Sequence, residues 1–353
     1  MSRSSLFGFL ACALLFGAAC HRNDPPAYPP GYYPPGQYPP GQYPPGQYPP
    51  PGQYPPGQPP GTPPPQQYPP SPPVFNDPMS FVDMGFLHMR ANQVLAELRA
   101  ALPPSYRAAV EQVPLMIDDT PGEVNAFAAC TKNGPIMAIT DGLLEISSQM
   151  ARAKATDELF GTQKLTQYLQ LLSQNQQPKM PIVRPDPSFW DPAQDADGRK
   201  VARQHDLLDE QIAFILGHEQ AHHYLQHTGC AGAQPSIITP ADIGRLLSNV
   251  VPVFNQPNEL AADTQGVTNT LNTGRARQGF HWNEEGALLT LNFFVILMQM
   301  DPADRVLFAF QATHPPPELR IPVVQQTANQ WRQTGGAANS PFPFPFMFPG
   351  AGG

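Results

Sequence analysis

Apolar residues recur at helical spacing along most of the chain between residues 75 and 335. Short runs of strand character occur only between residues 114 and 139. This pattern predicts one mainly helical α+β domain over residues 75–335, with a small β-sheet. The predicted strands are 114–117 and two within 125–139, the predicted helices are 81–101, 106–112, 143–149, 157–174, about 206–228 and 285–299, and a loop is expected at 177–198.

The segment 285–299 is the most apolar of these helices. A membrane-spanning helix needs about 20 consecutive apolar residues, and this segment is shorter and contains Asn292. Its composition favours a buried core helix, or one that contacts a membrane surface, over a spanning helix.

Residues 1–19 have the pattern of a signal peptide, with a positive charge at Arg3 and an apolar run too short to span a membrane. The small residues before Cys20 resemble the lipobox of bacterial lipoproteins, which predicts a lipidated Cys20 and a membrane anchor. Ordinary cleavage after Ala19, giving a secreted protein, remains open. Both alternatives predict export, and the first places the protein on the periplasmic side of the bacterial cell envelope.

Two segments are too biased in composition to form a core. Residues 20–74 hold about half of the chain's 48 prolines, in repeats of Tyr-Pro-Pro-Gly-Gln. Such a sequence favours extended polyproline conformation, so we expect a disordered linker that holds the domain away from its anchor. Residues 336–353 form a tail rich in Pro and Phe.

The formal net charge is −8, only 14% of the residues are charged, and the sequence has no basic run. Nucleic-acid binding requires a basic patch, so this composition argues against that class of function.

Export also bears on the four cysteines. Cys12 lies in the signal peptide and Cys20 is the candidate lipid site, which leaves Cys130 and Cys230. In an oxidising compartment these two could form a disulfide, with free or buried thiols as the alternative.

The segment His218-Glu219-Gln220-Ala221-His222 has residue types and spacing that suit zinc-dependent hydrolysis. Residues four apart share one face of a helix, so His218 and His222 can direct two imidazole nitrogens at one metal ion. Glu219 lies beside them, where it can take a proton from water and act as a general base.

The surrounding residues predict a mostly buried helix of about 22 residues that begins near Asp206 and ends near Thr228, longer than the average for globular proteins. On such a continuous helix, His223 and His227 lie away from the ligand face. They are therefore predicted to be packing or surface residues.

A catalytic zinc site needs a third protein ligand, and Glu259 in Asn258-Glu259-Leu260-Ala261-Ala262-Asp263 is the candidate. Asp263 follows one helical turn later, where it can accept the N–H of a ligand histidine and fix its tautomer. The alternative is a surface Glu and Asp on an ordinary helix.

The order of these motifs resembles that of the gluzincin metallopeptidases. Two further segments are similar to the HtpX and CAAX-prenyl-protease family. The first is Asn125-Ala126-Phe127-Ala128 with the following Ile136-Met137-Ala138-Ile139-Thr140-Asp141-Gly142-Leu143-Leu144, and the second is Thr313-His314-Pro315-Pro316-Pro317-Glu318-Leu319-Arg320-Ile321.

This resemblance implies a zincin-like metallopeptidase domain that binds one Zn²⁺ per chain. It implies that residues Asn125, Ala126, Phe127 and Ala128 form an edge strand bordering the active-site cleft, where substrate backbone adds as a further strand. It also places His314 and Arg320 near the active site, as candidates to donate a hydrogen bond to the reaction's oxyanion.

The expected function is that of a zinc endopeptidase of the cell envelope, acting on unfolded or misassembled proteins. The alternative is a chaperone-like or binding lipoprotein that keeps the fold without catalysis.

Overall fold

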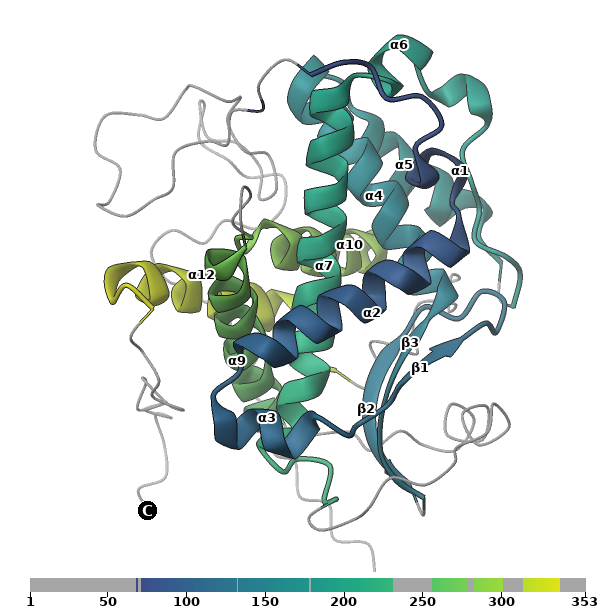
Figure 1. Ribbon diagram of the computed structural model, residues 1–353. Coiled ribbons are helices and arrows are strands. Elements are labelled where there is room, and N and C mark those ends of the chain that lie inside the picture. The colour runs from purple at the N-terminus through teal and green to yellow at the C-terminus, as the bar shows by residue number, and fades with distance from the viewer. Residues whose placement is uncertain are drawn as a thin grey trace, which may run out of the picture. The chain divides into compact units, whose positions relative to one another are not determined.

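The computed structural model describes residue 68 and residues 71–131, 133–177, 179–230, 256–277, 282–300 and 314–336 (Figure 1). The predicted signal peptide, the Cys20 lipid site, the linker up to residue 67 and the tail from residue 337 lie outside the described residues. Those assignments therefore stay predictions.

The described chain is mainly helical. Its helices are α1 (Pro78–Phe81), α2 (Met84–Ala101), α3 (Pro104–Val110), α4 (Asp141–Phe160), α5 (Lys164–Asn175), the short 3₁₀ helix η1 (Pro187–Phe189), α6 (Pro192–Asp195), α7 (Gly198–Tyr224), α9 (Gln256–Ala276), α10 (Glu285–Met300) and α12 (Pro317–Gln333).

The described strands are β1 (Leu115–Asp118), β2 (Ala126–Thr131) and β3 (Gly134–Thr140), and they form one sheet in the order β1-β3-β2. β1 runs parallel to β3, whereas β2 is antiparallel to it. The central strand β3 is buried at nearly every residue, as expected for a strand that is covered on both faces. β2 lies at one edge of this sheet. The prediction of a mainly helical α+β domain with a small sheet is confirmed.

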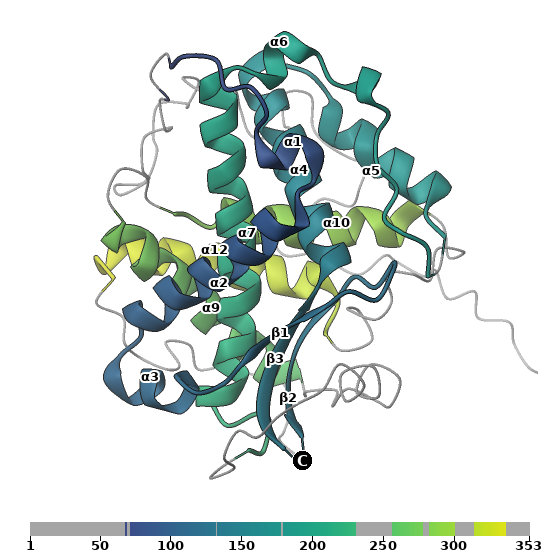
Figure 2. The same ribbon diagram turned by 45° about the vertical axis from the view of Figure 1, so that its right-hand side comes forward.

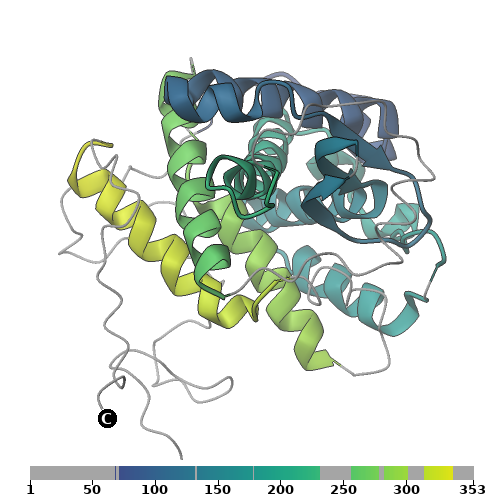
Figure 3. The same cartoon turned by 90° about the horizontal axis from the view of Figure 1, so that it is seen from below.

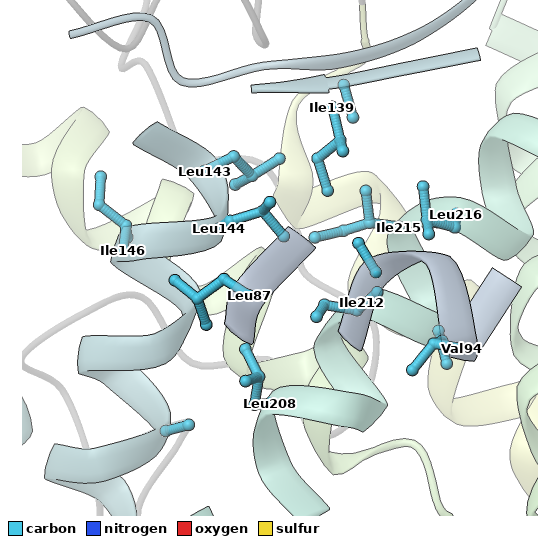
Figure 4. Close-up of a cluster of buried hydrophobic side chains, with 14 of the residues drawn as sticks. Leu87, Val94, Ile139, Leu143, Leu144, Ile146, Leu208, Ile212, Ile215 and Leu216 are labelled. Atoms are coloured by element: carbon cyan, nitrogen blue, oxygen red, sulfur yellow. The ribbon is translucent and has the colours of Figure 1, made fainter. Parts of the chain in front are cut away.

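The long helix α7 is the centre of the domain. α9 and α12 lie on one side of it and the sheet lies on the other (Figures 1 and 3). α2 crosses α7 (Figure 2), and α4 and α10 also pack against α7. Apolar side chains from α2, α4, α7 and β3 meet in the main core, including Leu87, Leu144, Ile139 and Ile212 (Figure 4).

Three helices, α4, α5 and α7, differ in extent from the prediction. The expected helix at 157–174 is instead the end of α4 and the whole of α5, because Gly161 takes a left-handed conformation (φ 65°) that ends α4. The carboxylate of Asp157 then accepts the backbone N–H groups of Lys164 and Leu165, which stabilises the start of α5.

α7 spans 27 residues, more than the length expected for it. It begins at Gly198 because Asp197 caps it by accepting the N–H of Arg199, and it ends at Tyr224, before the predicted stop. η1 and α6 lie in the segment expected to be a loop, and α12 is a helix that the periodicity did not predict.

The apolar helix α10 is part of the core in its described portion. Leu291, Phe293 and Phe294 are buried at 0–1% exposure, which confirms the core assignment for these positions. Among the described residues, no helix is both long and apolar enough to cross a membrane.

Cys130 at the end of β2 is joined to Cys230, which follows α7, by a disulfide of S–S distance 2.05 Å. The two cysteines are 100 residues apart in sequence. In the chain-entropy description, closing a loop of this size stabilises the folded state by about 4–5 kcal/mol. The bond ties the edge strand to the end of the central helix.

Candidate metal centre and active site

α7 brings three polar side chains into the interior of the domain. His218, Glu219 and His222 are exposed by only 2%, 1% and 0%. Because His218 and His222 are one helical turn apart, their rings meet, with 3.1 Å between the two Nε2 atoms. The helix therefore presents both imidazoles from the same face.

α9 adds Glu259, which is fully buried. Its Oε2 lies 3.4 Å from His218 Nε2 and its Oε1 lies 3.4 Å from His222 Nε2. The approach of the two helices depends on a glycine pair, Gly217 and Gly266. A Cβ on Gly266 would come within 3.0 Å of the His218 backbone nitrogen, so a side chain there would push α9 away from the histidines.

His314, which precedes α12, completes the cluster. One ligand atom each from His218, His222, Glu259 and His314 all lie within 4.8 Å of one another, and all four residues are buried. His314 Nε2 also lies 3.5 Å from Glu219 Oε1. The structure thus brings together residues from α7, α9 and the segment before α12.

The residues fit a zinc ion. Imidazole nitrogens and a carboxylate oxygen are ordinary zinc ligands, and tetrahedral bonds of about 2.0–2.1 Å separate ligand atoms by roughly 3.4 Å. The separations of 3.1–3.4 Å between His218, His222 and Glu259 are close to that value. Among the described residues, neither buried oxygen of Glu259 accepts a hydrogen bond of normal geometry, and a cation would satisfy both.

Asp263, one turn after Glu259 on α9, contacts Nδ1 of His218, the ring nitrogen that does not face His222. Its Oδ1 lies 2.9 Å from His218 Nδ1 and accepts a 2.7 Å bond from Arg320 Nη2, and its Oδ2 accepts a 2.9 Å bond from Arg320 Nε. Burial alone would raise the pKa of Asp263, but the Arg320 charge and the His218 hydrogen bond lower it to about 2. The carboxylate is therefore ionised.

The two histidines on α7 have opposite electrostatic environments. Burial alone would lower the pKa of His218, but the hydrogen bond to Asp263 and the nearby Glu259 carboxylate raise it to about 9. Burial and the neighbouring His218 hold the pKa of His222 well below its usual range. A histidine must be neutral to bind a metal, so a metal held at this cluster would displace a proton from His218.

The comparison with known proteins agrees with this geometry. The model of peptidase family M48 matches residues 87–328, which include every residue of the cluster. The chain belongs to peptidase family M48. Searches of curated proteins and of solved structures found no match. The resemblance to HtpX-like and CAAX-protease-like zinc metallopeptidases is thereby confirmed.

Arg320 of this M48 peptidase lies beside the cluster, near the active site, as the resemblance implies. It is only 1% exposed and its guanidinium is directed at Asp263, with Nη2 also 3.3 Å from His218 Nδ1. Burial opposes its charge, but Asp263 raises the pKa of Arg320 above its usual value. A group held in this way supports a ligand and does not face a substrate.

His223 is a packing residue, as predicted, whereas His227 differs from its predicted position. His223 is buried, and its Nε2 lies 2.8 Å from the backbone oxygen of Ile136, which links α7 to the central strand β3. His227 Nδ1 lies 3.0 Å from His222 Nδ1. The expectation that His227 lies far from the ligands assumed a continuous helix, but α7 ends at Tyr224 and the chain turns back.

The proposed substrate strand begins at the edge of the sheet. Asn125 precedes β2 and its backbone N–H donates to Thr140 Oγ1, and Ala126, Phe127 and Ala128 are the first residues of β2. All four are buried, at 0–1% exposure.

Replacing Asp263 with Asn tests the interactions of Asp263 with His218 and Arg320. The change leaves the buried Arg320 charge without its carboxylate, so we expect unfolding free energy in the presence of EDTA to fall by about 3–5 kcal/mol. This unfolding free energy is measured by titration with guanidinium chloride. The matched control is Asp197→Asn. Asp197 forms a partly exposed ion pair and caps α7, and Asn can also serve as a helix cap, so the expected change in unfolding free energy is below about 1 kcal/mol. Equal stability of Asp263→Asn and the unchanged protein would contradict the assignment.

Proposed function

We propose that this M48 peptidase is a zinc-dependent endopeptidase that holds its metal with His218, His222 and Glu259 and uses Glu219 as general base. The observation that carries the proposal is the convergence of these buried donors beside Glu219. Glu219 Oε2 is buried and accepts no hydrogen bond among the described residues, which leaves it available to a water molecule at the cluster.

When bound, zinc acts as a Lewis acid that polarises the peptide carbonyl and lowers the pKa of water. The chain's own residues then handle the proton. Glu219 accepts it from the attacking water and passes it to the leaving amine. Asp263 accepts the Nδ1–H of His218, and Arg320 holds Asp263 in place. Their role is to fix the tautomer and orientation of His218, so that Nε2 is directed at the metal.

His314 lies beside the other three donors, where it could fill the fourth position of a zinc site. A catalytic zinc site has three protein ligands and an open fourth position, whereas four protein donors are typical of a closed structural site. With His314 inside the cluster, the described arrangement has four donors. We infer that His314, if bound as a fourth ligand, withdraws before hydrolysis. This differs from the sequence-based assignment of His314 as an oxyanion donor.

Family membership and the edge strand β2 both bear on the class of substrate. Membership of a peptidase family implies protein or peptide substrates. We propose that an extended segment of an unfolded or misassembled protein adds along the β2 edge, beginning at Asn125. Two links support this geometry: His223 connects α7 to β3, and the Cys130–Cys230 disulfide connects β2 to the end of α7. Together they fix the strand edge relative to the proposed ligands.

The first test compares Glu219→Gln and Glu259→Gln with the unchanged protein, using an unfolded protein as substrate and zinc analysis of each sample. Loss of the general base should reduce cleavage by about 10²–10⁴-fold while zinc stays bound. Loss of the Glu259 carboxylate should weaken zinc binding itself. A protein that binds zinc and the unfolded substrate but never cleaves it would favour the chaperone-like alternative.

Replacing His314 with Ala distinguishes its two proposed roles. If His314 closes the site, its removal should raise the rate of cleavage several-fold and speed the loss of zinc to a chelator. Both are measured on one preparation, with Glu219→Gln/His314→Ala as the inactive control. A fall in cleavage with unchanged zinc retention would instead support an oxyanion donor.

We also propose that the enzyme is anchored in the cell envelope by a lipid on Cys20, on the basis of the N-terminal sequence. Expressed in a bacterium with its own signal peptide, the unchanged protein should fractionate with membranes. Cys20→Ala should be released into the soluble envelope fraction. Recovery of the unchanged protein in the soluble fraction would favour secretion after cleavage at Ala19.

A further inference from the structure

The turn after α7 has a defined geometry. The N–H of Gln226 donates to His223 O at 2.9 Å, and the N–H of His227 donates to His222 O at 2.8 Å. Gln226 is left-handed, with φ of 65°. These two bonds and the left-handed residue are the features of a Schellman motif, in which the residue after the left-handed position packs back against the last turn of the helix.

In this motif the chain turns back at the helix end, so the residue five positions after His222 lies beside His222. His222 accepts the backbone bond that spans five residues, so the side chain of His227 lies next to that of His222 and not on a further helical turn. The two ring centroids are 5.1 Å apart and the Nδ1 atoms are 3.0 Å apart. The contact is thus a consequence of how the helix ends.

The two nitrogens of the His222 ring face different partners. Nε2 faces the cluster, 3.1 Å from His218 Nε2 and 3.4 Å from Glu259 Oε1. Nδ1 faces His227. A neutral imidazole that binds a metal through Nε2 carries its hydrogen on Nδ1 and donates it. His227 Nδ1 is therefore the acceptor, and the N–H of the His227 ring is on Nε2.

The two ligand histidines are thus held by different partners. His218 Nδ1 faces the carboxylate of Asp263, which is paired with Arg320, whereas His222 Nδ1 faces the imidazole of His227. The turn that carries His227 is fixed at both ends, by the helix end on one side and by Cys230, which is in the disulfide, on the other.

We propose that His227 is a positioning residue for His222, accepting its Nδ1–H and directing its Nε2 at the metal. The proposal rests on the zinc site proposed above. It assigns a metal-supporting role to a histidine outside the His-Glu-x-x-His motif, and it explains the spacing of His222 and His227 by the geometry of the helix end.

The test uses the full protein and two substitutions of His227, one that removes the hydrogen-bond acceptor and one that keeps an acceptor. His227→Leu removes the acceptor but keeps a side chain of similar bulk. His227→Asn keeps an acceptor oxygen close to the position of the lost Nδ1. Zinc affinity is measured by competition with a chromophoric chelator, and the visible absorption of the cobalt-substituted protein reports ligand geometry. Unfolding in EDTA shows whether each variant is folded.

We expect His227→Leu to bind zinc about 10–100-fold more weakly, as is typical when the partner of a ligand histidine is removed. The cobalt spectrum should change with it. His227→Asn should stay within a few-fold of the unchanged protein, and both variants should unfold in EDTA at the same denaturant concentration. Unchanged zinc affinity in His227→Leu, or equal losses in the Leu and Asn variants, would overturn the proposal.

His222→Ala is measured alongside to separate this inference from the proposed function. If His222→Ala loses zinc while His227→Leu keeps it, the zinc site stands and the positioning role is wrong. If His222→Ala keeps full zinc affinity, the proposed ligand set is wrong, and the positioning role falls with it.

Discussion

The site depends on the close packing of α7 against α9. The proposed metal donors come from both helices, and they can reach a common point only because Gly217 and Gly266 let the two backbones approach. A side chain at either glycine would meet backbone atoms of the other helix at about 3.0–3.2 Å. The rest of the core, where α2, α4 and α10 surround α7, holds the central helix in the position that this contact requires.

A second constraint is electrostatic. Glu219, Glu259 and Asp263 bring three carboxylates into the interior, and Arg320 supplies one positive charge. When all four groups are ionised their charges sum to −2, which a divalent cation offsets. Buried charges without a partner are costly, so this arrangement favours a bound cation. In the metal-free protein, part of the compensation comes from a proton on His218, whose pKa is raised to about 9.

The sequence predicted most of the elements and the residues proposed as ligands, because helical periodicity and the spacing of His218, Glu219, His222 and Glu259 are local properties. It could not predict contacts that depend on where an element ends. His227 was assigned to a distant face because the helix was expected to continue to about Thr228. A turn made by Gln226, which is not glycine, gave no signal that the helix would end at Tyr224. The partner of Arg320 was not predicted for a related reason: its ion pair with Asp263 joins α12 to α9, and no local pattern indicates that these helices meet.

The most direct test of the central claim is to determine what the buried cluster holds. Purified protein should be analysed for metal content and by X-ray absorption at the zinc edge. We predict one zinc per chain, with nitrogen and oxygen ligands and the scattering of imidazole rings, and loss of this signal in Glu259→Gln. A protein purified under zinc-replete conditions that contains no zinc, or zinc bound through sulfur, would contradict it.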